Sequence, residues 1–411
     1  MRSNYKKSGN YIRQIDIRNT EEKTDNLLGV SVTKKFIPSI ANTVGTDFSK
    51  YKIVKKHQFT YIPDTSRRGD KIGLALLEHL DKALVSQAYT VFEIIDKNEL
   101  DPEYLMMWFT RPEFDRYARY MSHGSVREIF GWDEMCDVEL PVPSIEKQRE
   151  IVKEYNTIVN RIKLNEQLNQ KLEETAQAIY KQWFVDFEFP NKERKPYKSS
   201  GGEMVYNEEL QQEIPKEWGI TSIESISKDI VCGKTPSTLI EDNFGNSMSF
   251  LTIPDMHNKV FAGKTERSLS LKGVNTQKNK TLPANSLCVS CIGTSGLVVL
   301  TTEECQTNQQ INSVICKDNI SYYYMYFGLK ALENIIREWG AKGSVGANLN
   351  KSEFSAIKIL LPALTYLPIF HDLVEPFFNN MKSYHKEKYL LENMQELLLS
   401  SMASKQLEAV V

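Results

Sequence analysis

Two Gly-Lys-Thr triplets, beginning at Gly233 and Gly263, have the residue types that close a phosphate-binding loop. Such a loop needs another glycine five positions earlier, so that backbone N–H groups can surround the phosphates. Lys228 and Asn258 stand at those positions instead. The sequence also lacks the glycine fingerprint of dinucleotide binding, a His-Glu-x-x-His pair, a Gly-x-Ser-x-Gly turn and the Asn-Pro-Pro-aromatic run of amino-methyltransferases. It therefore predicts a chain without catalytic residues of its own.

Two cysteines, Cys288 and Cys291 in "CVSC", have the spacing of a zinc-ligand pair. The surrounding run "NSLCVSCIGTSG" alternates like a β-strand, in which residues i and i+3 point to opposite faces. We therefore expect buried structural cysteines and no metal site. Six cysteines in 411 residues are too few for a disulfide scaffold, which predicts reduced thiols in a cytoplasmic protein.

Two basic, polar stretches are suited to nucleic acid. The loop from Tyr61 to Gly73, "YIPDTSRRGDKIG", carries Arg67, Arg68 and Lys71 beside an aromatic residue, and arginine bonds guanine or phosphate in a bidentate manner. The second stretch, "FAGKTERSLSLKGVNTQKNKTLP", interleaves cations with amides, and "QTNQQIN" adds amides that fit adenine edges. The candidate DNA-binding residues of the second stretch are Lys264, Arg267, Lys272, Asn275, Gln277, Lys278 and Lys280. In "QTNQQIN" the candidate is Gln309. Either stretch taken alone is more often an ordinary solvated surface.

A repeat indicates how these loops are positioned. "GSVREIFGWDEMCDVELPVP" begins at Gly124 and "GSVGANLNKSEFSAIKILLP" at Gly343, 219 positions later and without a gap. Upstream, Asp101 before Pro102 and Ser321 before "YYYMYFGLKALENIIREW" predict the capped starts of two matching helices. Each helix follows a β-like apolar run, "YTVFEI" or "NSVIC". The repeat therefore covers whole units and not a single motif.

Two stretches of about 40 residues follow the repeated motif, and both are free of glycine and rich in helix formers. A seven-residue template places apolar residues on one seam of each, with polar interruptions at matching levels, as in a coiled coil. The predicted helix-pair seam includes Ile158, Ile162, Leu172, Ile179, Phe377, Met381, Leu391 and Leu398. The interruptions are Asn165, Asn169, Lys388 and Gln395. Pro368 and Pro376 predict that the second helix starts late or bends there.

An ordinary amphipathic core helix is the alternative for each stretch. A helix of that length spans roughly 60 Å, too long for the core of a 150-residue domain, so we expect the two to pack on each other. The segment between them, which contains "NKERKPYKSSGGEMVYNEELQQEIPKEW", has the polar, Gly- and Pro-containing composition of a linker.

The predicted fold class is α+β, with two repeated domains of mixed sheet and helices. Two long antiparallel helices forming a coiled coil separate them, and the whole has an internal pseudo-two-fold repeat. The expected boundaries are 1–144 for the first domain, 145–187 for the first helix, 188–214 for the linker, 215–363 for the second domain, 364–404 for the second helix and 405–411 for a tail. A net charge of −2, from 51 basic and 53 acidic residues, favours no particular partner. The absence of a long apolar run predicts a soluble protein.

With this layout, the chain resembles the specificity subunit of type I restriction-modification systems. The resemblance rests on "NLLGVSVTKKFIPSIANTVGTDFSKYKIVKKHQFTYIP", "LNQKLEETAQAIYKQWFVDFEFP", "SSGGEMV" with "EIPKEW", and "LCVSCIGTSG" with "TNQQIN". It implies a non-catalytic subunit in which each recognition domain reads one half of a bipartite, asymmetric DNA sequence and the paired helices set the gap. The basic residues above rest on charge and loop position and are not carried over from a family motif.

The resemblance also implies partners. Two adenine methyltransferase subunits that use S-adenosylmethionine would dock on the helices, and restriction subunits that use ATP and Mg²⁺ would complete the complex. This chain would bind no cofactor itself. Two alternatives remain: the recognition subunit of another restriction class with a similar layout, and a coiled-coil interaction scaffold that does not touch DNA.

Overall fold

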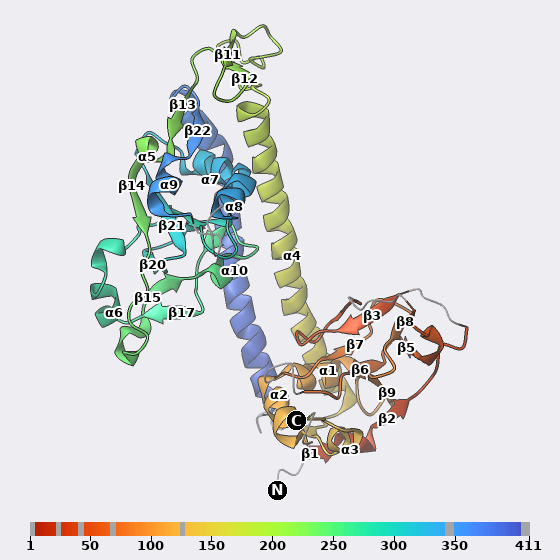
Figure 1. Cartoon of the computed structure of the whole chain (residues 1–411). Helices are drawn as coiled ribbons and strands as arrows, with labels where there is room; N and C mark the ends of the chain where they lie inside the picture. The colour runs from red at the N-terminus through yellow and green to blue at the C-terminus, as the bar shows by residue number, and fades with distance from the viewer. Residues whose placement is uncertain are drawn as a thin grey trace. The chain divides into compact units, whose positions relative to one another are not determined.

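A computed structural model describes residues 5–21, 26–39, 45–65, 71–123, 128–341 and 349–403. The chain forms two compact units, residues 1–162 with 390–411 and residues 163–389. The two long helices, α4 (Ile145–Phe184) and α10 (Tyr366–Ser401), therefore each contribute to both units (Figure 1). Within the described residues, no helix is both long and apolar enough to cross a membrane.

The first unit contains two four-stranded sheets. One has the order β2-β9-β6-β7 and is antiparallel throughout, and the other has the order β4-β3-β8-β5 with β3 parallel to β8. The strands are β1 (Tyr5–Lys7), β2 (Ile12–Ile15), β3 (Leu27–Val30), β4 (Phe36–Pro38), β5 (Lys52–Lys55), β6 (Phe59–Tyr61), β7 (Leu74–Leu76), β8 (Lys82–Val85), β9 (Thr90–Ile94) and β10 (Glu139–Pro141). The helices are α1 (Pro102–Thr110), α2 (Pro112–Met121) and α3 (Trp132–Cys136).

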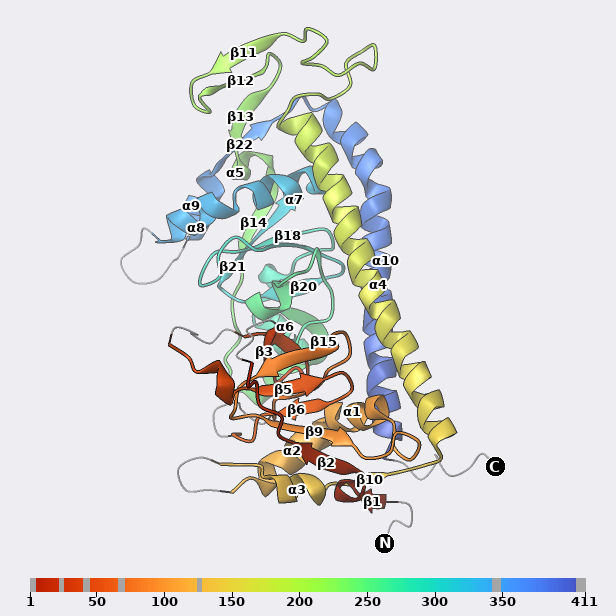
Figure 2. The same cartoon turned by 90° about the vertical axis from the view of Figure 1, so that its right-hand side faces the viewer.

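The second unit repeats this topology. Its antiparallel order β14-β21-β18-β19 matches β2-β9-β6-β7, and the parallel pair β15·β20 with β17 on its edge matches β3·β8 with β4. Figure 2 labels β14, β15, β18, β20 and β21 of this unit. The strands are β11 (Met204–Asn207), β12 (Gln212–Pro215), β13 (Gly219–Ser222), β14 (Ser227–Cys232), β15 (Phe244–Leu251), β16 (Phe261–Ala262), β17 (Arg267–Leu269), β18 (Leu287–Ser290), β19 (Val298–Thr301), β20 (Cys305–Thr307), β21 (Ile311–Cys316) and β22 (Lys358–Leu361). The helices are α5 (Ile223–Ile226), α6 (Leu271–Asn275), α7 (Tyr322–Ala331), α8 (Glu333–Ala341) and α9 (Lys351–Ala356).

The predicted helix caps are confirmed. The Asp101 side chain accepts hydrogen bonds from the N–H groups of Glu103 and Tyr104, and the Ser321 hydroxyl accepts one from Tyr324. The stretch expected as one helix after Asp101 is two, because Pro112 lacks the N–H needed to continue α1 and instead begins α2. The matching stretch also divides, into α7 and α8.

The two long helices contact each other in both units. In the first, Gln395 donates to the Tyr155 hydroxyl at 2.8 Å; in the second, Lys388 Nζ lies 2.5 Å from Glu166 Oε1 and the ring centroids of Tyr180 and Phe370 are 6.2 Å apart. Residue numbers thus fall along α10 as they rise along α4, which makes the pair antiparallel. Of the two outcomes predicted from Pro368 and Pro376, a late start of α10 is wrong, since the helix begins at Tyr366 and continues through Pro376. A bend at these prolines stays a prediction.

The predicted seam positions lie on the less exposed side of these helices. Met381 is buried, and the other seven, Ile158, Ile162, Leu172, Ile179, Phe377, Leu391 and Leu398, are partly buried. The template omitted Phe378 and Leu399, which are both buried. Phe378 packs on Tyr323 and Tyr326 of α7, so α10 buries a wider face than a two-helix seam requires.

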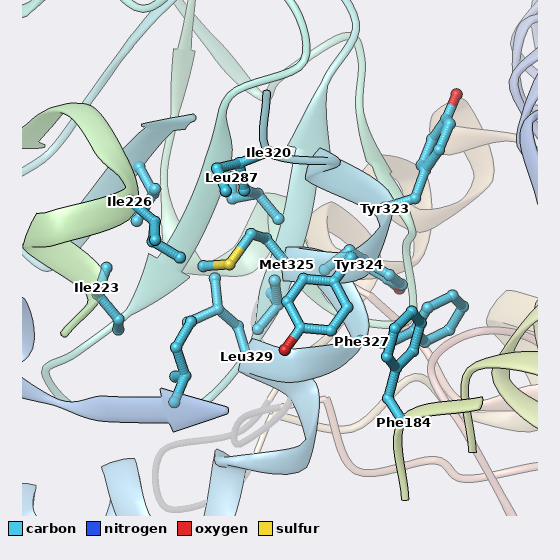
Figure 3. Close-up of a cluster of buried hydrophobic side chains, with 14 of the residues drawn as sticks. Phe184, Ile223, Ile226, Leu287, Ile320, Tyr323, Tyr324, Met325, Phe327 and Leu329 are labelled. Carbon is cyan, nitrogen blue, oxygen red and sulfur yellow. The ribbon is translucent and has the colours of Figure 1, made fainter. Parts of the chain in front are cut away.

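An aromatic cluster joins α7 to the long helices in the second unit (Figure 3). The ring centroid of Phe184, at the end of α4, lies 4.7 Å from that of Tyr324 and 4.9 Å from that of Phe370. Met325 and Leu329, on the opposite side of α7, pack among Leu287 of β18 and Ile223 and Ile226 of α5. Helix α7 is therefore the element through which this recognition sheet is attached to its long helices.

The segment expected as a linker is more ordered than its composition suggests. Strands β11 and β12 form a hairpin, and Phe189 is buried with its ring stacked on Tyr197 and Trp218 at centroid distances of 4.5 and 4.9 Å. The polar composition concealed this because a few aromatic contacts are enough to hold a short segment. The boundaries given for the linker and the domains remain predictions.

The two cysteines of "CVSC" are buried in different clusters. Cys288 packs with Leu251 and Val299, whereas Cys291 belongs to the larger cluster that includes α7. Burial raises the pKa of the Cys288 thiol to about 12 and that of Cys291 to about 11. Both are therefore neutral thiols near pH 7, and none of the six cysteines is paired in a disulfide.

Candidate nucleic-acid interface

The first basic loop connects β6 to β7. Arg67 and Arg68 lie outside the described residues, and Lys71 is exposed. Tyr61, the aromatic residue at the start of this stretch, is fully buried, with its ring edge-to-face against Phe92 and Phe130. Tyr61 belongs to β6 and not to the loop, and its ring is part of the core.

The stem of this loop is held by hydrogen bonds. The Thr65 N–H donates to the Glu128 carbonyl at 3.0 Å, and the Thr65 and Ser122 hydroxyl oxygens are 2.9 Å apart. The Gly-Ser-Val motif at Gly124, outside the described residues, falls between these two partners in sequence. The described residues on either side of this motif, Ser122 and Glu128, therefore both bond Thr65, where the basic loop begins.

The second basic stretch is more dispersed than its sequence suggests. Lys264 Nζ lies 4.7 Å from the ring centroid of Tyr389 and donates to its hydroxyl at 3.1 Å, which attaches the stretch to α10. The guanidinium of Arg267 lies 4.2 Å from the ring centroid of Phe244. Cation–π contacts of this kind restrict where the charged groups reach.

Three further cations differ in their surroundings. Lys272 forms an exposed ion pair with Asp242 at 3.1 Å. Lys278 and Lys280 lie in a short 3₁₀ turn, where Lys278 is exposed and Lys280 is half-buried. Lys278 and Lys280 are therefore the cations of this stretch that best fit contact with phosphate.

The amides divide into exposed and structural groups. Gln309 is exposed and accepts a hydrogen bond from Thr235, and Asn275 is also exposed. Gln277 and Gln306 are buried and bonded to each other at 2.8 Å, and Gln306 also donates to Thr281 at 2.9 Å. The expectation that these amides read bases is wrong for Gln277 and Gln306, because their polar atoms instead hold the turn that carries Lys278 and Lys280.

The interface is one of charge and hydrogen bonding. Phosphate contacts by Lys and Arg supply affinity and register, whereas amide and guanidinium contacts to base edges supply sequence discrimination. Sequence reasoning missed Lys34 and Asp115, a buried ion pair beside the first loop. Their separation of 81 positions leaves no signal in the sequence.

Comparisons with known proteins agree with this architecture. The family model for the type I restriction modification DNA specificity domain matches residues 2–174 and 215–367. The type I restriction enzyme HindI specificity subunit of Haemophilus influenzae is 30% identical over 90% of this chain and 91% of its own length. The MjaIX specificity subunit of Methanocaldococcus jannaschii is 27% identical over 75% of this chain and 70% of its own length.

A solved structure shares the fold. The type I restriction-modification S subunit from M. genitalium superposes with a TM-score of 0.57 at 14% identity, covering 97% of this chain and 95% of that one. The two family matches fall on the two repeated units, as their common strand order requires. By sequence and by fold, the chain belongs to the family of type I restriction-modification specificity subunits.

Proposed function

We propose that this chain is the non-catalytic, DNA-reading subunit of a type I restriction-modification complex, and that each repeated unit reads one half of a bipartite, asymmetric DNA target. The observation that carries this proposal is the repeat itself. The two units share the order and direction of their strands but present different side chains in their loops. Two units with the same strand order but different loop side chains are suited to a DNA target whose two halves differ in sequence.

The residues proposed to contact DNA follow from charge and exposure. For the first half they are Arg67, Arg68 and Lys71, and for the second they are Lys278, Lys280 and Gln309. Lys264 and Arg267 retain N–H donors for phosphate, but their contacts with Tyr389 and Phe244 restrict their reach, so we rank them lower. The family match supports a DNA-reading role but does not assign these residues.

The partners proposed are two adenine methyltransferase subunits and the restriction subunits of such a complex. Those subunits would use S-adenosylmethionine, ATP and Mg²⁺, and this chain would hold none of these. Helix α10 exposes two short apolar rows, Ile369 with Leu373 and Leu390 with Met394 and Leu397. Rows at helical spacing suit burial against a partner.

The decisive experiment sequences methylated adenines in cells with and without this chain. We expect one bipartite motif, with a fixed gap between its halves, to lose methylation when the chain is removed. Methylation that is unchanged in every motif would instead favour a helical scaffold that does not touch DNA. Identifying the co-purifying subunits distinguishes a type I complex from another restriction class with a similar layout.

A further inference from the structure

A buried ion pair lies beside the first basic loop. Lys34, in the turn between β3 and β4, places its Nζ 2.5 Å from Oδ1 of Asp115 on α2, and the two side chains are only 6% and 11% exposed. Removing two charges from water is expensive, and a well-packed apolar pair of similar volume is often as stable. Stability alone therefore does not account for Lys34 and Asp115.

Both charged groups bond the backbone of one residue. Lys34 Nζ donates to the Ile72 carbonyl at 2.8 Å, and the Ile72 N–H donates to Asp115 Oδ1 at 3.1 Å. Ile72 is itself buried, and the next residue toward the loop is the exposed Lys71. The pair thus bonds both backbone polar groups of Ile72, the residue at which the chain enters β7 from the loop.

Helix α2 also holds the other side of the loop. Ser122, directly after α2, contacts the Thr65 hydroxyl and donates to the carbonyl of Ala118 in the last turn of the helix at 2.6 Å. Thr65 on one side of the loop is therefore tied to Ser122, directly after α2, and Ile72 on the other side is tied to Asp115 of α2. Removing either attachment would leave the backbone on that side of the loop without this support.

We propose that Lys34 and Asp115 are positioning residues that set the sequence specificity of the first half-site by holding Ile72 and, next to it, the exposed Lys71 at the described end of the first basic loop. This inference rests on the proposed DNA-reading function and adds to it two residues that do not touch DNA. The geometry explains why charges are used. An apolar pair could fill the same space but could not bond both the carbonyl and the N–H of Ile72.

The test uses the full chain assembled with its methyltransferase subunits and compares the motifs methylated by the wild-type and variant complexes. In the variant Lys34→Met with Asp115→Leu, we expect the preference for the correct base in the first half to fall about tenfold or more, the size of a lost base contact. Reading of the second half should not change. The matched control is Lys7→Met with Asp137→Leu, which removes an exposed ion pair of the same unit.

Three outcomes would overturn the positioning role. One is an unchanged base preference in the first half of the motif methylated by the double variant. Another is an equal loss of both halves, which would indicate general unfolding. If the double variant proves unstable to heat, Asp115→Asn takes its place, because the amide keeps an acceptor for the Ile72 N–H. This variant should show a smaller loss of base preference, confined to the first half. The third contradicting outcome is an Asp115→Asn variant with no loss of base preference in the first half. A wild-type complex that methylates no bipartite motif would instead contradict the proposed function itself.

Discussion

At the scale of the residue, charge by itself was a poor guide to which side chains can meet DNA. Of the cations in the second basic stretch, Lys264 and Arg267 lie against aromatic rings and Lys272 pairs with Asp242. Lys278 and Lys280 lie on a turn whose position is held by the buried amides of Gln277 and Gln306. The same polar stretch therefore contains both the lysines proposed to contact DNA and the buried amides that hold their turn in place.

Replacing Lys278 and Lys280 by alanine should weaken DNA binding to all sequences nearly equally. Each lost phosphate contact removes about one released counterion, so the slope of log affinity against log salt should fall by about 1 per residue. The measurement is a salt titration of DNA affinity for the assembled complex. Lys272→Ala, at the ion-paired position, is the control and should change the slope less; equal effects would contradict the assignment.

His385 makes stability depend on pH. It packs on Gly263, where an added Cβ would lie only 2.5 Å from its Nε2, and burial lowers its pKa, with Lys259 and Lys388 adding to the shift. As the pH falls, the unfolded chain binds a proton at this histidine before the folded chain does. The contribution of neutral His385 to folding stability is therefore complete above pH 6.5 and is lost as the pH falls from 6.5 toward the lower pKa of the folded chain. One proton contributes at most about 1.4 kcal/mol per pH unit.

The variant His385→Gln should therefore show a smaller fall in melting temperature between pH 7.5 and pH 5.5 than the wild-type chain. His371, whose pKa is also lowered by burial and whose ring contacts Tyr322 and Tyr323, would continue to titrate in that variant. His371→Gln should remove a separate part of the pH dependence. An unchanged pH dependence in both variants would contradict these assignments.

At the scale of the element, the two long helices combine a seam with anchoring contacts. Glu173 of α4 accepts hydrogen bonds from Tyr326 at 2.7 Å and from Lys330 at 2.5 Å, both on α7. Phe184 and Phe378 pack against the same helix. Within the second unit, α7 is therefore attached to α4 and α10 by buried rings and a partly buried ion pair.

The proposed function predicts that the length of the helix pair sets the gap between the two halves of the DNA target. Seven residues inserted after Ile162 in α4 and seven after Tyr389 in α10 would preserve the seven-residue seam and add about 10 Å. The methylated motif should keep both halves and gain about three base pairs in its gap, at about 3.4 Å per base pair. Seven residues inserted in the β11–β12 hairpin are the control, and a gap that stayed constant in the helix variant would show that the helices do not set the gap.

At the scale of the whole molecule, the repeat is imperfect where partners would bind. The apolar row Leu390, Met394 and Leu397 corresponds, 219 positions earlier, to Lys171, Thr175 and Ala178 on α4. Leu397 is 70% exposed. The docking surfaces proposed on the two long helices would therefore differ in polarity, and we expect the two proposed methyltransferase subunits to depend on them unequally.

Replacing Met394 by lysine and Leu397 by glutamate leaves the net charge unchanged and should release one methyltransferase subunit while the other stays bound. Burying one such side chain is worth about 1.5–3 kcal/mol, so affinity at that surface should fall by tenfold or more. The mass of the intact complex measures this. Leu239→Glu, at a leucine that is 94% exposed on a recognition domain, should leave the mass unchanged; a complete complex in both variants would contradict this docking surface.

The sequence by itself determined the elements and their repetition. The caps at Asp101 and Ser321, the alternation around Cys288 and the seven-residue pattern from Ile158 to Ile179 are set by neighbours within one or two turns, so they can be read locally. Only the tertiary structure decided which polar residues face solvent. Lys264 contacts a ring 125 positions away, Gln277 an amide 29 away and Lys34 a carboxylate 81 away. Burial and pairing depend on such distant partners, and a linear pattern does not contain them.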